Sequence, residues 1–149
     1  MKSIVAFLLL SGNALAADKE YIDYNFDGVA DYRIYRESDG KMHFYDIFLY
    51  SPSTKKYQKS DILSGLFNPS PDSKLKEIHC IAPGGHSGGI FYREDYAWKD
   101  DALTFLRTVQ QTDKQVDGNL VYVRVTSVIR NGKPFVDDIQ ILNPQELRK

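Results

Sequence analysis

Apolar and polar residues alternate along most of this chain with a period of two, the period of a strand with one buried face. The clearest stretch is 120–130, where Val121, Val123 and Val125 fall on one side of the expected strand. Asn131-Gly132 follows and is a strong signal for a two-residue hairpin. The same pattern predicts strands at 32–36, 42–50, 75–81, 90–98, 103–111 and 120–130, with a last strand ending at Leu142.

Turn signals between these segments indicate an antiparallel all-β fold. Ser38-Asp39-Gly40 is a turn sequence, and residues 51–58 are typical of a turn into a short return strand. Residues 61–74 contain two prolines and a glycine, so we expect an irregular connection there, with a helical turn near 62–66. Closely spaced strands joined by tight turns form a sandwich or a barrel, here as a meander of hairpins. We expect a single domain at 17–149.

The first sixteen residues have the pattern of a secretory signal peptide. Lys2 precedes an apolar run at 4–10, and Ala14-Leu15-Ala16 is a small-residue cleavage site. The apolar run is too short to span a membrane. We therefore expect residues 1–16 to be removed on export to the periplasm; the alternative is a buried N-terminal strand.

Charge and cysteine content limit the classes of partner and the means of stabilisation. The chain has 19 Lys+Arg against 20 Asp+Glu, a net charge of −1, which argues against general attraction to nucleic acid or to an anionic membrane. Cys80 is the single cysteine, so no disulfide closes within the chain. We expect Cys80 to be a small core residue, and the core to hold the fold unaided apart from any metal.

An acidic loop at residues 23–31 follows the spacing D-x-N-x-D-G-x-x-D. Calcium binds six to eight oxygen ligands, and short side chains at alternate positions of a tight loop converge on one point. Ile34 stands where an EF-hand has its bidentate glutamate, so binding should be weak, with Kd on the order of 10⁻⁴–10⁻³ M. The alternative is an Asx-rich turn solvated by water. The expected ligands are the side chains of Asp23, Asn25, Asp27 and Asp31 and the backbone carbonyl of Val29.

A glycine-rich stretch at 84–89 is the second candidate site. Residues 85–89 satisfy G-x-S-x-G, but the nucleophile elbow of α/β-hydrolases needs a helix afterwards, and an aromatic strand follows here. Two interpretations remain: a flexible hairpin loop, or a narrow probe whose glycines let the backbone approach a partner closely. For the second, the partner-binding candidates are His86, Ser87, Gly88, Gly89, Tyr92 and Arg93.

Four motifs occur in the order found in a known group: "DYNFDGVADYRIY", "GGHSGG", "IFYREDYAW" and "LTFLRTVQQ". Together with the signal peptide, they resemble exported bacterial calcium-binding proteins related to periplasmic i-type lysozyme inhibitors. This group includes immunity proteins against lysozyme-like secreted effectors. The resemblance implies an antiparallel β-sandwich with a protruding loop that plugs the cleft of a peptidoglycan hydrolase. The family loop resembles S-G-x-x-Y; Ser87-Gly88 matches it, but Tyr92 lies five residues after Ser87.

We therefore expect a protein inhibitor of a lysozyme-like peptidoglycan hydrolase and not an enzyme, with homodimer formation left open. The alternative is a calcium-dependent glycan-binding or peptidoglycan-binding module that uses Tyr45, Tyr96 and Trp98 as sugar platforms, although ordinary packing within the strands is the other interpretation of each of these rings. A glycosidase is less well supported, because Glu94 and Asp95 are neighbours on a strand and face opposite ways. The three histidines lack the spacing of a zinc site.

Overall fold

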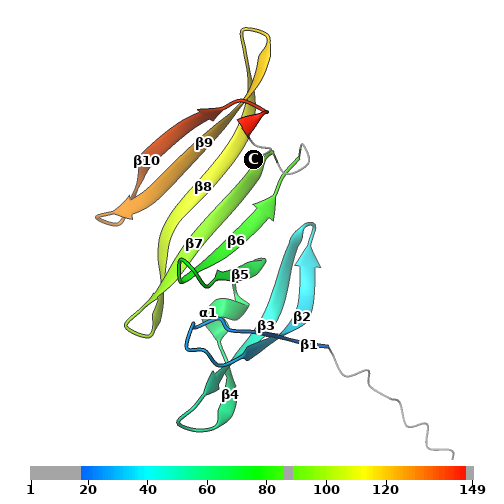
Figure 1. Cartoon of the computed structure of the whole chain (residues 1–149), viewed down its shortest axis with the longest axis vertical. Helices are drawn as coiled ribbons and strands as arrows, with labels where there is room; N and C mark the ends of the chain where they lie inside the picture. The colour runs from blue at the N-terminus through cyan, green and yellow to red at the C-terminus, as the bar shows by residue number, and fades with distance from the viewer. Residues whose placement is uncertain (1–17, 86–88, 147–149) are drawn as a thin grey trace, which may run out of the picture.

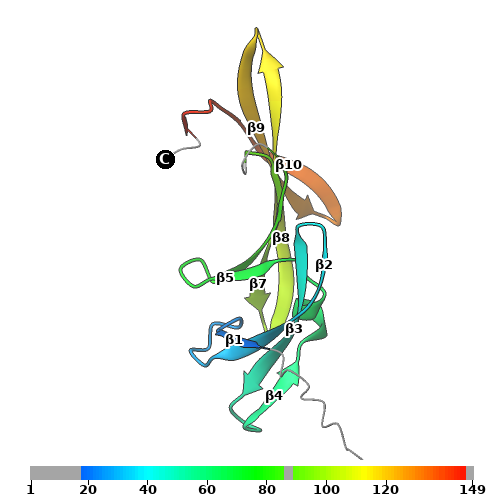
Figure 2. The same cartoon turned by 90° about the vertical axis from the view of Figure 1, so that its right-hand side faces the viewer.

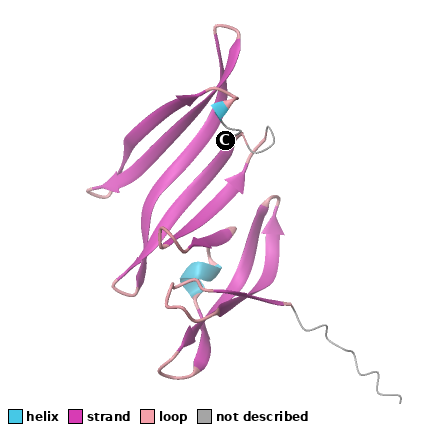
Figure 3. Ribbon diagram, in the orientation of Figure 1, coloured by secondary structure: helices cyan, strands magenta, loops and turns pink. Residues whose placement is uncertain are grey.

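The computed structural model describes residues 18–85 and 89–146, and in this part of the chain nearly every element is a strand (Figure 3). The first sheet has four strands in chain order, β1 (Lys19–Ile22), β2 (Asp31–Asp39), β3 (Met42–Ser51) and β4 (Lys56–Lys59). A four-residue helix, α1 (Asp61–Ser64), follows (Figure 1). The second sheet has the order β10-β9-β8-β7-β6-β5 and consists of β5 (Pro69–Asp72), β6 (Glu77–Pro83), β7 (Phe91–Lys99), β8 (Ala102–Val116), β9 (Asn119–Arg130) and β10 (Lys133–Leu142).

The predicted antiparallel all-β sandwich built as a meander of hairpins is confirmed. Within each sheet every strand pairs antiparallel with its neighbour in the chain. The helical turn expected near 62–66 is α1, one residue earlier, with Ser60 as its N-cap. The expected signal peptide at 1–16 and three of the predicted contact residues, His86, Ser87 and Gly88, lie outside the described residues.

Two short strands, β1 and β5, were not predicted from the sequence. β1 reads Lys-Glu-Tyr-Ile and its first three residues are exposed, so it has no apolar alternation to detect. β5 contains two prolines, which normally argue against a strand because proline cannot donate to the ladder. It is tolerated because β5 is an edge strand that pairs on one side with β6.

The core lies between the two sheets and contains five fully buried apolar residues: Tyr24, Ile47, Leu63, Ile78 and Cys80. Ile78 and Cys80 are two positions apart on β6, so their side chains point to the same face of the strand. This face of the six-stranded sheet packs against the four-stranded sheet. Burial raises the pKa of the Cys80 thiol to about 12. The prediction that Cys80 is a core residue is therefore confirmed. The raised pKa keeps the thiol protonated at neutral pH, which disfavours a role as a nucleophile.

The six-stranded sheet has one face toward the core and one charged face. Ile78, Trp98 and Leu103 point to the core side, whereas His79, Asp95 and the residues that pair with them point to the other side. Figure 2 shows the four-stranded sheet against the lower part of the six-stranded sheet, with β9 and β10 extending beyond it. β6 ends and β7 begins in the upper half of this sheet, below the hairpin that joins β8 to β9 (Figure 1).

Within the two described ranges, the structure contains no helix with the length and hydropathy needed to cross a membrane.

Candidate functional site

The acidic loop between β1 and β2 is organised around one buried carboxylate. Asp31 opens β2 and is 0% exposed. Its Oδ2 accepts the backbone N–H of Tyr24 and its Oδ1 accepts that of Tyr50, each at 2.8 Å. Burial raises the pKa of Asp31 above its usual value; the two hydrogen bonds oppose this, and the carboxylates of Asp27 and Asp23 add to it. The negative charges of Asp27 and Asp23 therefore lie close enough to act on the Asp31 carboxylate.

The remaining polar side chains close the loop on itself. Asp27 Oδ1 accepts the N–H of Val29 at 2.7 Å, and Asp23 Oδ2 accepts the N–H of Gly28 at 3.0 Å. Asn25 Oδ1 accepts the N–H of Asp27 at 3.2 Å. Gly28 has φ of +85°, a left-handed conformation that other residues adopt only with strain. The turn geometry expected of a cation loop is thus provided by the chain itself.

One oxygen of this loop has no hydrogen-bond donor. Asp23 Oδ1 is buried and makes no hydrogen bond within the described part of the chain. A buried carboxylate oxygen without a partner is costly, and a bound cation would remove that cost. The residues predicted as ligands therefore fit a calcium ion: carboxylates gathered around a tight turn, one of them with an unused oxygen, and each Asp31 oxygen with a further lone pair.

The acidic loop is also fixed to the second sheet. Trp98 Nε1 donates to the Tyr24 carbonyl at 2.8 Å, and the Tyr24 side chain is fully buried in the core. A cavity of 330 Å³ lies beside the loop and is lined by Asn25, Asp27, Leu49, Trp98 and Asp101. Asp101, in the turn between β7 and β8, brings a further carboxylate to this cavity, which the sequence did not suggest because Asp101 lies some 70 positions from the loop.

The stem of the glycine-rich loop is held tightly at its base. Gly84 N–H donates to the Ile90 carbonyl at 2.8 Å, and Ile90 N–H donates to the Gly85 carbonyl at 3.3 Å. A Cβ on Gly84 would lie 2.6 Å from Ile90 Cγ2, so only glycine fits there. The two arms of the loop are consequently closed against each other where β6 ends and β7 begins.

Residues from three other strands or turns brace the same stem. Gln111, 1% exposed, donates from Nε2 to the Gly89 carbonyl at 2.9 Å. A Cβ on Gly89 would lie 2.7 Å from the Tyr122 ring, so Gly89 packs directly on that ring. Lys41, in the turn between β2 and β3, donates from Nζ to the Gly84 carbonyl at 3.0 Å. These contacts could not be predicted from the sequence, because each joins residues more than 20 positions apart.

The predicted contact residues that follow the loop are divided between two faces of the sheet. Tyr92 is 36% exposed, and its hydroxyl donates to Glu94 at 2.8 Å. Burial, together with Glu94, raises the pKa of Tyr92 to about 12. Arg93 points to the opposite face and pairs with Asp95 at 2.9 Å. The structure therefore brings Gly89 and Tyr92 to the region of the loop base and turns Arg93 onto the charged face.

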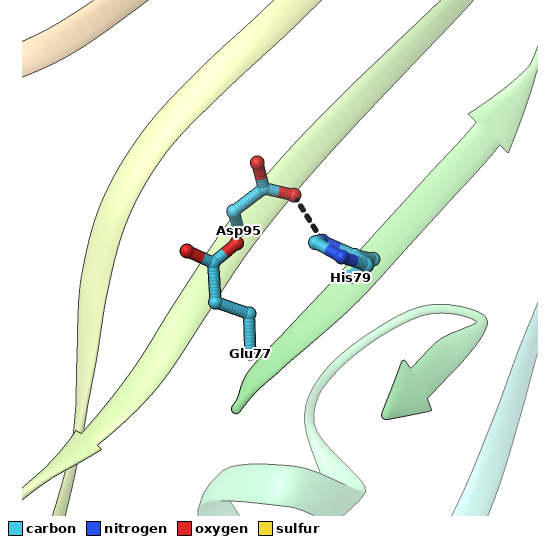
Figure 4. Close-up of side chains that lie close together, drawn as sticks. All are labelled: Glu77, His79 and Asp95. Carbon is cyan, nitrogen blue, oxygen red and sulfur yellow. Dashed lines mark hydrogen bonds and ion pairs between the residues drawn. The ribbon is translucent and has the colours of Figure 1, made fainter. Parts of the chain in front are cut away.

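Glu77, His79 and Asp95 form a cluster on the charged face (Figure 4). Their ligand atoms lie within 4.8 Å of one another, close enough to hold a metal ion. His79 Nδ1 is 2.6 Å from Asp95 Oδ1, and Arg107 pairs with both Asp95 and Glu77. The guanidinium groups of Arg93 and Arg107 already pair with the Asp95 carboxylate, which weakens the attraction of this cluster for a cation.

The aromatic residues considered as sugar platforms are placed as the alternative interpretation, ordinary strand packing, expects. Tyr45, Tyr96 and Trp98 are partly buried and pack against the core cluster, so they do not form an exposed platform. The outer face of the four-stranded sheet instead carries five aromatic rings in contact with one another, from Tyr21, Tyr32, Phe48, Tyr50 and Tyr57. We call these five residues the aromatic patch.

Comparison with known proteins gives one structural neighbour and no sequence relative. No family model matches the chain, and no curated protein matches it. A solved structure described as a Xanthomonas type IV secretion system related protein superimposes with a TM-score of 0.59 at 16% identity. The match covers 79% of this chain and 56% of that chain, so this chain spans little more than half of the neighbour's length. At this identity the match shows a shared fold.

Proposed function

We propose that this protein is a periplasmic inhibitor of a lysozyme-like peptidoglycan hydrolase and that its glycine-rich loop enters the catalytic cleft of that enzyme. The observation that carries the proposal is the bracing of the loop base by Lys41, Gln111 and Tyr122. A loop fixed at both arms loses less conformational entropy on binding than a free one, so more of its contact energy appears as affinity. The stem is held by three side chains, from Lys41, Gln111 and Tyr122, which a simple hairpin turn does not need.

The chemistry of the loop suits the target. Glycosidases of the lysozyme type use two carboxyl groups that flank the scissile bond. The Ser87 hydroxyl can donate to one carboxyl oxygen and accept from a protonated carboxyl group. Tyr92 would supply an aromatic ring for a sugar subsite, with its hydroxyl oriented by Glu94. Inhibition by this route needs no catalytic group on the inhibitor, in line with our expectation that the protein is not an enzyme.

In this proposal calcium has a structural role and stabilises the fold. Asp23, Asn25, Asp27 and Asp31 would hold it, with the Val29 carbonyl as a further ligand. A bound calcium ion supplies positive charge that offsets repulsion among the carboxylates. Because Tyr24 and Trp98 connect this loop to the core and to β7, the ion would stabilise the contact between the two sheets.

The resemblance to immunity proteins and the identity of the structural neighbour support the same direction. That neighbour is described as a type IV secretion system related protein, and the sequence resembles immunity proteins against lysozyme-like secreted effectors. We therefore propose that the target is a secreted lysozyme-like effector or a host lysozyme, met in the periplasm after removal of residues 1–16.

A panel assay tests the proposal. The mature protein is mixed with lysozymes of the c, g and i types and with lysozyme-like secretion effectors, and the clearing of peptidoglycan is followed. Stoichiometric inhibition of at least one enzyme is expected. Tyr92→Phe should weaken that inhibition, whereas Tyr35→Phe, at an exposed tyrosine on β2, should leave it unchanged. Full activity of every enzyme at a large excess of the protein would refute the proposal.

The aromatic patch favours a second candidate function, binding of peptidoglycan glycan strands. Tyr21 and Tyr57 are 59% and 41% exposed, and sugar rings stack on exposed aromatic faces. Sedimentation with purified peptidoglycan, in the absence of any hydrolase, separates this function from inhibition. Under this candidate Tyr21→Ala with Tyr57→Ala should abolish sedimentation; sedimentation that the double substitution leaves intact would count against the patch.

A further inference from the structure

A pocket of 260 Å³ opens on the charged face of the six-stranded sheet, away from the core. It spans four strands, from β7 to β10, and no part of it belongs to the acidic loop or to the loop stem described above. Three guanidinium groups surround it, with one aromatic, one buried valine and two neutral polar side chains. The lining residues are Phe91, Arg93, Arg107, Val109, Arg124, Thr126 and Gln140.

Two of the three arginines are already neutralised. Arg93 pairs with Asp95 at 2.9 Å, and Arg107 pairs with Asp95 at 2.7 Å and also with Glu77. Asp95 is 0% exposed, so these pairs form the base of the charged face and leave little negative charge accessible to solvent. They fix both arginine side chains at the rim of the pocket.

Arg124 is different, because it has no carboxylate partner among the described residues. Its Nε donates to Gln111 Oε1 at 2.8 Å, and its guanidinium group lies 5.9 Å from the centre of the Phe91 ring. No other hydrogen bond of this group occurs within residues 18–85 and 89–146. Toward the described part of the chain, the two terminal nitrogens of Arg124 thus have unused donors beside the pocket.

We propose that this pocket binds a carboxylate group, with Arg124 as the principal ligand. The planar fork of a guanidinium group matches a carboxylate in a bidentate arrangement. Asp95 and Glu77 already pair with Arg93 and Arg107, so Arg124 is the guanidinium group of this lining that has no ion pair among the described residues. Thr126 and Gln140 add neutral hydrogen-bonding groups, although the Gln140 amide also donates to Asp138 at 2.7 Å.

The pocket is connected to the glycine-rich loop through one side chain. Gln111 accepts from Arg124 with its oxygen and donates to the Gly89 carbonyl with its nitrogen. A carboxylate bound at Arg124 would therefore sit one residue away from the loop base. The inference stands on the pocket and its charges, however, and does not require that the protein be an inhibitor.

The carboxylate could be a free small molecule or the acidic side chain of a bound protein, and two probes distinguish these sources. The first is sodium acetate. The second is an N-acetylated peptide with a single glutamate between apolar residues, with its glutamine counterpart as the negative control. Binding is followed by NMR at the arginine Nε–H resonances, with ionic strength held constant by sodium chloride.

A saturable shift of the Arg124 resonance by acetate or by the glutamate peptide supports the site. If acetate is enough to shift the resonance, the pocket binds small free carboxylates. If only the glutamate peptide shifts it, the pocket binds an acidic side chain of another protein. Arg124→Gln should raise the apparent Kd at least about tenfold. Arg130→Gln is the matched control, because Arg130 lies on the same strand but pairs with Asp137 outside the pocket.

A second variant keeps the test valid if Arg124→Gln loosens the loop or fails to fold. Thr126→Val with Gln140→Leu changes the pocket lining but keeps the two hydrogen bonds that connect Arg124 to Gly89 through Gln111. This variant should also weaken binding, with an unchanged melting temperature. The proposal is overturned if neither probe gives a saturable shift at Arg124, or if Arg130 shifts as much as Arg124. It is also overturned if binding survives both sets of substitutions.

Discussion

The acidic loop at 23–31 and the glycine-rich stem at 84–90 are both tight turns, but they are held in opposite ways. The acidic loop is closed mainly by its own side chains, which accept backbone N–H groups within the loop; Tyr50 is the exception. The stem has no polar side chain among its described residues and is fixed from outside by Lys41, Gln111 and Tyr122.

This difference indicates what each loop is suited to do. A loop held by its own carboxylates concentrates negative charge and changes its stability when a cation arrives. A stem held by distant side chains keeps its own surface free for a partner. This difference supports the proposal of a structural role for the first loop and a recognition role for the second.

The largest effect is expected from removing the buried carboxylate of the acidic loop. Asp31→Ala deletes two buried hydrogen bonds to Tyr24 and Tyr50, and each N–H left without a partner costs about 1–3 kcal/mol. The free energy of unfolding should fall by about 4 kcal/mol in urea denaturation. Asp27→Ala is the control; its contacts are local and exposed, so the loss should be below about 1 kcal/mol. Equal losses would contradict the central role of Asp31.

The next effect concerns the stem. Gly89→Ala places a methyl group against the buried Tyr122 ring and should destabilise the protein by about 2 kcal/mol, because a packed aromatic ring gives way poorly. At Gly85 the nearest atom to an added Cβ is 4.0 Å away, so Gly85→Ala should be nearly neutral. Thermal unfolding of both variants makes the comparison. A neutral Gly89→Ala would show that the stem is not fixed from outside.

Calcium should act on the acidic loop alone and in a pH-dependent way. With Kd of about 10⁻⁴–10⁻³ M, 10 mM calcium at pH 7 should stabilise the fold by about 1.4–2.7 kcal/mol. Without metal, the raised pKa of Asp31 favours folding below its usual range, and this contribution is lost as pH rises through the raised value. Calcium competes with that proton, so its stabilisation should shrink as pH falls through the same interval.

Calorimetric melts at pH 7 and pH 4, with calcium or with sodium chloride of equal ionic strength, measure this effect. The account expects a clear upward shift of the melting temperature by calcium at pH 7 and a smaller one at pH 4. If calcium does not shift the melting temperature at pH 7, the acidic loop is an Asx-rich turn solvated by water and not a calcium site.

The smallest effect is expected at Lys41, the exposed side chain that holds the stem. Lys41→Met removes the hydrogen bond to the Gly84 carbonyl, which is exposed to solvent, and should cost about 0.5 kcal/mol or less. Its consequence should be local: faster amide exchange at the stem, with the rest of the sheet unchanged. Faster exchange across both sheets would mean that Lys41 stabilises the fold as a whole.

The sequence was a good guide where structure depends on neighbours in the chain. The alternation at Val121, Val123 and Val125 located β9, and the Asn131-Gly132 turn located the hairpin to β10. The carboxylate spacing at 23–31 likewise identified a polar turn whose members lie close together. In each case the interacting groups are less than ten positions apart, so their spacing carries the information.

The sequence was a poor guide where the structure joins distant residues. The contact of Gln111 with Gly89 depends on the pairing of β7 with β8, and that of Tyr122 with Gly89 on how β9 follows. The cluster of His79 and Asp95 likewise depends on the register of β6 against β7. Without that register, the sequence leaves open whether Tyr45, Tyr96 and Trp98 are exposed sugar platforms or packed rings; in the structure they pack against the core.

The central claim is that the braced glycine-rich loop contacts the hydrolase, and one inhibition constant tests it most directly. Against an enzyme that the wild-type protein inhibits, Ser87→Ala should raise the inhibition constant by about tenfold to a hundredfold. Ser53→Ala, in the exposed turn between β3 and β4, should leave it unchanged. An inhibition constant for Ser87→Ala equal to that of the wild-type protein would contradict the account.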